Sequence, residues 1–152
     1  MKAKDYLYQV KKIDKMIANK IAEKTQWEAI AMGTTASING DRVQASGSQQ
    51  KMEEKILKIF EIEEEINECI NRLIDAKKDV IATIEKLPAT EYDLLHKVYI
   101  GRMVFRNGNH VNEYMSLNEV ADSKGKTYTW ATTVHGRALK DVQDILNERG
   151  KK

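Results

Sequence analysis

The sequence is short of cysteine and of long hydrophobic runs, and each shortage excludes a class of protein. Its 152 residues contain a single cysteine, Cys69, so no disulfide can form within the chain, and we expect a reducing compartment. The sequence has no run of about 18 apolar residues, which is the length a membrane-spanning helix needs. The N-terminal "MKAKDYLYQVKKIDK" carries too many charges for a signal peptide. We therefore expect a cytoplasmic protein without a membrane partner.

Signatures of catalysis are also missing. The three histidines, His96, His110 and His135, show no spacing typical of metal ligands, either with one another or with the cysteine. No glycine-rich phosphate loop precedes a basic residue, and no serine or cysteine lies in a nucleophile motif. The acidic run "EIEEEINE" is typical of the solvated face of a coiled coil. We therefore expect no enzyme activity, no metal and no cofactor.

Charge and helical periodicity are what the sequence does have. Charged residues make up 32% and hydrophobic residues 41%, a combination typical of long exposed helices. Residues 2–32 place apolar side chains every three or four positions, which predicts an amphipathic helix that ends at Gly33. The polar segment 33–48 predicts a loop, and a second helix is expected from about residue 48 to residue 86.

The second helix carries a heptad repeat, which is the clearest pattern in the chain. Apolar residues at every seventh position, with a second row between them, predict a coiled-coil seam. A helix of this length, roughly 57 Å at 1.5 Å per residue, needs a partner helix. The first row is Met52, Ile59, Ile66, Leu73, Val80 and Leu87, and the second row is Ile56, Ile70 and Ile84, interrupted by Glu63 and Lys77.

Two partners for this seam are open. Residues 1–32 carry seven basic and four acidic groups, whereas residues 49–88 carry seven basic and ten acidic groups. Because the two helices have opposite net charge, we expect residues 1–88 to form an antiparallel coiled-coil hairpin that serves as a structural spacer. The alternative is self-association through the same stripe, which would make a homodimer.

Pro88 ends the helical pattern and marks the boundary to a second module. A short helix is expected after it, with Thr90 as a candidate N-cap. In the segment 101–115, the pair Asn107-Gly108 lies between short apolar runs, which is a signal for a β-hairpin.

Two helices joined by a short turn complete this module. Ser116 with Glu119 three residues later predicts a capping box, and Gly125 ends that helix. The last helix is expected from about residue 127 to residue 148. The fold class is therefore all-α, with residues 89–152 forming a helix-turn-helix domain.

The charges around the last helix favour a nucleic acid as the binding partner. The net charge of the chain is only +2, but the segment 124–140 has no acidic residue in seventeen positions, as neutralisation of phosphates requires. A turn of 100° per residue gives the helix an apolar side of Ala131, Val134, Ala138, Val142 and Ile145. The candidate contacts to double-stranded DNA are Lys124, Lys126, Thr127, Tyr128, Thr129, Thr132, Thr133, Gly136, Arg137 and Lys140.

Gly136 lies in the middle of the polar side, although glycine costs about 1 kcal/mol relative to alanine inside a helix. A residue without a side chain would let the helix approach a duplex closely. Alternatively, Gly136 makes room for a neighbouring element of the protein or only loosens the helix.

The segments "GDRVQASGSQQKM", "IEKLP", "LLHKVYI" and "VHGRALKDVQDIL" resemble a family of small phage and prophage proteins of Gram-positive bacteria. These proteins have a C-terminal domain similar to region 4 of sigma-70-type factors and are related to ArpU and RinA type regulators of late phage genes. The resemblance implies a sequence-specific, DNA-binding transcriptional regulator in the cytoplasm of a bacterial host. It also places residues 127–140 where the family has its recognition helix.

The chain departs from this family after Tyr99, because "GRMVFRNGNHVNEYM" replaces a connection of a few residues. Arg102 and Arg106 of this insertion, residues 101–115, are candidates for a contact to the DNA backbone or for a partner surface. A second interpretation of the whole chain is a structural or adaptor protein. Its coiled coil would assemble it, and its C-terminal helices would bind RNA polymerase or a phage packaging component similar to a small terminase subunit.

Overall fold

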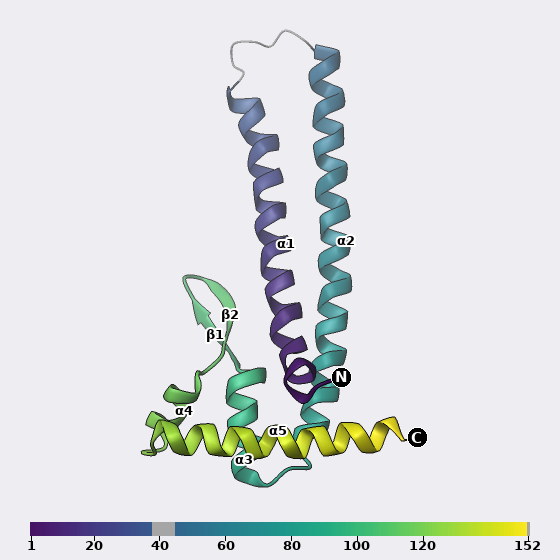
Figure 1. Cartoon of the computed structure of the whole chain (residues 1–152). Coiled ribbons are helices and arrows are strands. Elements are labelled where there is room, and N and C mark those ends of the chain that lie inside the picture. Colours follow the sequence, from purple (N-terminus) through teal and green to yellow (C-terminus); the bar gives the residue numbers. More distant parts are fainter. Residues whose placement is uncertain (38–44, 152) are drawn as a thin grey trace. The chain divides into compact units, whose positions relative to one another are not determined.

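The computed structural model describes residues 1–37 and 45–151, and most of them are helical (Figure 1). This agrees with the predicted all-α class, to which the structure adds one small sheet of two strands. None of the helices in these two ranges is long and apolar enough to cross a membrane. In chain order the elements are α1 (Ala3–Ser37), α2 (Ala45–Ile84), α3 (Ala89–Leu95), the π-helical turn η2 (His96–Ile100), β1 (Arg102–Arg106), β2 (Asn109–Glu113), α4 (Leu117–Ser123) and α5 (Tyr128–Gly150).

The chain divides into two compact units, and each long helix contributes to both. Unit 1 consists of Met1–Asp14 and Leu73–Lys152, and unit 2 consists of Lys15–Arg72. The sequence pattern instead places a boundary at Pro88. The first turns of α1 and the last turns of α2 belong to unit 1 because their apolar side chains share a core with the C-terminal helices.

In unit 2, two ion pairs join α1 to α2. Lys20 lies 2.5 Å from Glu65, and Lys24 lies 3.1 Å from Glu63, measured from the ammonium nitrogen to a carboxylate oxygen. The residue numbers rise along α1 as they fall along α2, so the two helices run antiparallel over this stretch. The ion pairs follow the difference in net charge between the two segments.

The second row of the predicted heptad seam is wrong for two of its members. Ile56 and Ile70 are 43% and 39% exposed, whereas Ile62 and Cys69 are only 2% and 3% exposed. Ile62 and Cys69 each lie three positions after a residue of the first row. Ile56 and Ile70, which the pattern predicts to be buried, each lie four positions after one. The seven-residue spacing identifies the first row of a seam. Residues three and four positions after each member of that row both recur every seven residues, so the sequence pattern alone does not tell which of them is buried. Packing against the partner helix decides this.

The ends of three helices also differ from the expected positions. The predicted loop 33–48 is helical at both ends, because α1 continues through Gly33 to Ser37 and α2 begins at Ala45; residues 38–44 lie outside the described residues. A glycine costs a helix about 1 kcal/mol but does not forbid its continuation. The N-cap of α3 is Pro88 and not Thr90.

Unit 1 has a continuous hydrophobic core to which α1, α2, α3, η2, α4 and α5 all contribute. The side of α5 that faces this core is the apolar side that its periodicity predicts. Ala131, Val134, Ala138 and Val142 are fully buried, and Ile145 is partly buried against them, so this prediction is confirmed. The rotation of α5 about its axis is therefore set by its sequence.

Local hydrogen bonds define both ends of α4. The hydroxyl of Ser116 accepts the backbone N–H of Glu119 at 3.1 Å, and the carboxylate of Glu119 accepts the N–H of Ser116 at 3.3 Å, which confirms the capping box. Gly125 follows the helix with a φ of +66°. Thr127 then caps α5 by accepting the N–H of Trp130 at 3.1 Å. The turn between α4 and α5 is therefore short and defined by its own residues.

The segment 101–115 contains the β-hairpin that the Asn107-Gly108 pair predicts. The two turn residues have φ angles of 50° and 80°, as the tight turns of antiparallel hairpins require. The base of the hairpin is fixed to α1, because Asp14 accepts hydrogen bonds from the amide of Asn112 at 2.9 Å and from the hydroxyl of Tyr114 at 2.8 Å. The hairpin is thus an ordered part of unit 1.

Gly101 connects η2 to the hairpin and has no room for a side chain. Its φ of +69° is strained for other residues, and an added Cβ atom would lie 2.3 Å from the backbone oxygen of Glu113 and 2.9 Å from the ring of Tyr114. The two strands of the hairpin leave the core side by side only because this position lacks a Cβ.

We expect Gly101→Ala to lower the free energy of unfolding by more than about 2 kcal/mol, since it adds a clash with backbone to the strain of a positive φ. Gly108→Ala is the matched control, because Gly108 also has a positive φ but an added Cβ there meets nothing within 4 Å. Urea denaturation followed by circular dichroism measures both variants. Equal losses of stability would contradict the close approach at Gly101.

Candidate nucleic-acid interface

The candidate DNA-contacting residues form one exposed surface at the start of α5 and in the turn before it. All ten are exposed except Thr132, which is half-buried. The buried apolar side of α5 fixes this outcome, because it turns the polar side away from the core. Figure 1 shows α5 with α4 at its N-terminal end and α3 against it.

Three threonines on this surface have hydrogen bonds within the chain. Thr127 is the N-cap of α5, and the hydroxyls of Thr132 and Thr133 both donate to the backbone oxygen of Thr129 at 2.9 Å. Phosphate oxygens only accept hydrogen bonds, so Thr132 and Thr133 would have to give up these bonds to donate to a phosphate. Their methyl groups can contact a thymine methyl without such a change.

The basic residues of the surface differ in how far they are neutralised. The ammonium of Lys124 lies 2.6 Å from a carboxylate oxygen of Asp93, and Lys97 lies 2.5 Å from the other oxygen. Burial alone would raise the pKa of Asp93, but the two ammonium groups hold it below its usual value. No ion pair within the described residues involves Lys126, Arg137 or Lys140. These three are therefore the cations most available to a phosphate.

Gly136 is exposed, and no element of the described chain covers it. A Cβ atom added there meets nothing within 4 Å. The described part of the protein thus supplies no neighbour for which the glycine would have to make room. Packing within these residues does not explain its cost to the helix.

The aromatic side chains near the start of α5 have different surroundings. Tyr128 is 56% exposed and free to contact a partner, although an aromatic at the start of a helix is more often part of the core. Trp130 is partly buried against the core. His135 is structural, because its Nε2 lies 2.8 Å from the hydroxyl of Tyr99 and burial lowers its pKa.

An acidic residue that the sequence analysis did not single out lies beside this surface. Glu91, in the first turn of α3, is only 7% exposed. Burial raises its pKa to about 7, helped by a hydrogen bond with Asp141 of α5 and by the charge of that carboxylate, while Arg137 has the opposite effect. No local sequence pattern could predict this pair, because Glu91 and Asp141 are fifty positions apart.

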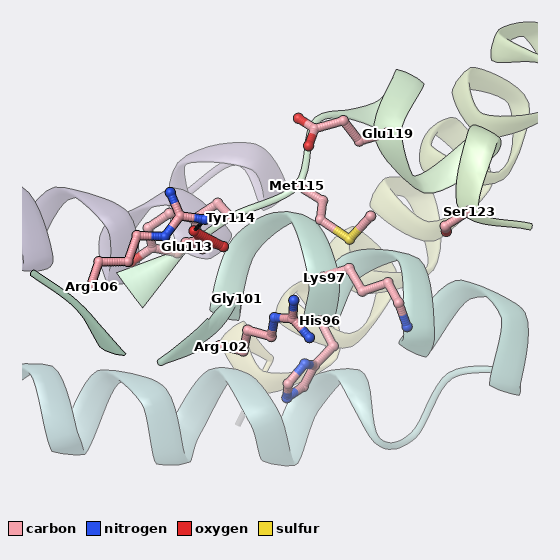
Figure 2. A pocket seen from close by; sticks show the side chains of 10 residues that line it. All are labelled: His96, Lys97, Gly101, Arg102, Arg106, Glu113, Tyr114, Met115, Glu119 and Ser123. Carbon is pink, nitrogen blue, oxygen red and sulfur yellow. Dashed lines mark ion pairs between the residues drawn. The ribbon is translucent and has the colours of Figure 1, made fainter. Parts of the chain in front are cut away.

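A second feature that the sequence did not reveal is a pocket of about 850 Å³ in unit 1 (Figure 2). Its walls come from η2, the β-hairpin and α4. Burial and the neighbouring Lys97 lower the pKa of His96 in this pocket, so its ring stays neutral to a lower pH than that of an ordinary histidine. The lining residues are His96, Lys97, Gly101, Arg102, Arg106, Glu113, Tyr114, Met115, Glu119 and Ser123.

In residues 1–37 and 45–151, no group of three or more histidine, cysteine or acidic side chains could hold a metal ion. A comparison of the chain with models of protein families, with curated proteins and with solved structures finds no match. The family resemblance therefore depends on the quoted sequence segments alone.

The pair Glu91 and Asp141 should make stability depend on pH. Because the pKa of Glu91 is raised from 4.5 to about 7, the folded chain binds more protons than the unfolded chain between these values. The free energy of unfolding should therefore fall as the pH rises from about 4.5 to about 7. Thermal unfolding across this range measures the effect, and Glu91→Gln should flatten it. An equally steep fall in the Gln variant would show that other groups cause it.

Proposed function

We propose that the protein is a sequence-specific, DNA-binding transcriptional regulator in which α4 and α5 form a helix-turn-helix and α5 is the recognition helix. One observation carries the proposal. The outward side of α5 is polar, free of acidic residues up to Lys140, and includes Gly136, which nothing in the described chain covers. Such a surface suits close approach to a polyanion.

The geometry of α4 and α5 supports this interpretation. A helix of seven residues is joined by a short, capped turn to a helix of 23 residues, and Val120 and Ala121 of the first are buried in the same core as Ala131 and Val134 of the second. In helix-turn-helix proteins the second helix enters the major groove with its N-terminal residues against the bases. Thr129 and Thr133 lie in that part of α5.

Each group on the surface has a chemical role in the proposal. The ammonium groups of Lys126 and Lys140 and the guanidinium of Arg137 neutralise phosphates, which gives affinity without sequence preference. The threonine methyl groups contact thymine, and Tyr128 packs on the sugar-phosphate backbone. The proposal assigns the chain no catalytic step and no cofactor.

The biological setting follows from the resemblance to phage and prophage regulators with a sigma region 4-like domain. We infer a regulator of phage or prophage genes that acts in the cytoplasm of a bacterial host, beside host RNA polymerase. The antiparallel hairpin of α1 and α2 would then serve as a spacer between the DNA-binding domain and another part of the assembly.

A second candidate function, assembly through the coiled coil, is favoured by apolar side chains that unit 2 leaves exposed. Leu57 and Phe60 of α2 are 61% and 58% exposed, and Ile56 lies beside them on the same helix. Exposed groups of large apolar residues commonly mark protein contacts. In this interpretation α2 pairs with a second copy of the chain, and the protein acts as a dimeric regulator or as an adaptor.

We expect the chain to bind duplex DNA with an affinity that falls steeply as salt rises. Replacing Lys126 and Lys140 together by alanine should reduce the slope of log K against log salt by about 1.8, because each phosphate contact contributes about 0.9. Lys151→Ala is the matched control, since this exposed lysine caps the opposite end of α5. Titration by fluorescence anisotropy at several salt concentrations gives the slopes. An unchanged slope in the double variant would overturn the assignment of this surface.

Gly136 should separate folding from binding. Gly136→Ala should stabilise the fold by about 1 kcal/mol, because alanine favours a helix and the added Cβ meets nothing. Gly136→Leu should fold as well but lose DNA binding, since the larger side chain would hold the helix away from the duplex. Thermal unfolding and DNA titration measure the two effects. Normal binding by the Leu variant would leave the glycine without a functional explanation.

A further inference from the structure

The pocket of unit 1 has more basic than acidic groups in its wall, and the acidic ones are already engaged. Lys97 comes from η2, and Arg102 and Arg106 come from β1 (Figure 2). Glu113 forms an ion pair with Arg106, and Glu119 accepts the N–H of Ser116 in the capping box of α4. Positive charge therefore remains in the pocket after its internal pairs are counted.

Arg102 is the group that carries this remaining charge. It is exposed, and no ion pair or hydrogen bond within residues 1–37 and 45–151 involves its guanidinium. Its neighbour in the pocket, Lys97, shares the carboxylate of Asp93 with Lys124, so one negative charge serves two positive ones. A guanidinium binds phosphate oxygens through parallel hydrogen bonds, which suits it to a phosphate ligand.

The same carboxylate connects the pocket to the candidate DNA surface. Lys124 belongs to the turn before α5, and Lys97 belongs to the wall of the pocket, yet both contact Asp93. Ser123, the last residue of α4, also lines the pocket. The turn before α5 and the wall of the pocket are thus joined through one carboxylate within unit 1.

The hairpin fixes the backbone at Arg102 before any ligand arrives. Gly101 allows β1 to leave η2 in close contact with Glu113, and the N–H of Met115 donates to the backbone oxygen of Lys97 at 3.0 Å. The two hydrogen bonds to Asp14 fix the other strand. A backbone that is already fixed loses less conformational entropy when its side chain binds a ligand.

We propose that the pocket between η2, the β-hairpin and α4 binds the backbone of the same DNA duplex, beyond the segment that α5 contacts, with Arg102 as the phosphate ligand. This inference rests on the proposed function, because it extends the footprint of α5 along the duplex. It also explains the insertion 101–115, since the hairpin adds backbone contacts that supply affinity and fix the register of α5 without reading bases.

The test compares salt slopes of duplex binding for four versions of the full chain. Arg102→Ala should reduce the slope of log K against log salt by about 0.9 relative to the wild type. Arg102→Lys should keep the wild-type slope, because it retains the charge, and Lys151→Ala should keep it as well. Circular dichroism and thermal unfolding show whether each variant folds.

The outcomes separate this inference from the proposed function. If Arg102→Ala keeps the wild-type slope while replacement of Lys126 and Lys140 flattens it, the pocket does not bind the duplex, and the role of α5 stands. If the wild-type chain binds no duplex, both the proposed function and this inference are wrong. Hydroxyl-radical footprinting should also show fewer protected backbone positions at one edge of the site in Arg102→Ala; an unchanged footprint would overturn the inference.

Discussion

The burial of the apolar side of α5 is the constraint on which the other features of unit 1 depend. Ala131, Val134 and Ala138 have no exposed surface, so α5 cannot rotate without moving a polar residue into the core or an apolar one into water. Two of these residues are alanines, whose small side chains let the packed helices approach closely. The same contact fixes Gly136 and the basic residues on the outside, and it brings Asp141 against Glu91 of α3.

Two aspartates connect elements that are far apart in the sequence. Asp14 of α1 holds the base of the β-hairpin through Asn112 and Tyr114, and Asp93 of α3 holds Lys97 and Lys124. The hairpin, η2 and the turn before α5 are therefore tied to one core rather than joined only by the chain. The segment 101–115 therefore has a defined geometry on this core.

Signals that are local in the sequence predicted the structure well. The capping box of α4, the turn Asn107-Gly108 and the apolar side of α5 all depend on residues within a few positions of one another, and all are present. Features that depend on a distant partner were not predicted: the covered flank of the α2 seam, the Glu91 and Asp141 pair, and the pocket at the hairpin. For the candidate surface, helical periodicity gave the exposed side of α5, but it could not reveal that Asp93 neutralises Lys124.

Selection of bound duplexes from a random pool by the full chain shows whether α5 reads DNA, because enrichment requires both binding and sequence preference. We expect enrichment of a short DNA element, and the arrangement of that element reports the oligomeric state of the protein. A single site would indicate that the protein binds DNA as a monomer, and two symmetric half-sites would indicate a dimer joined through the coiled coil. The claim that α5 reads DNA would be contradicted by a pool that remains random while the chain stays folded.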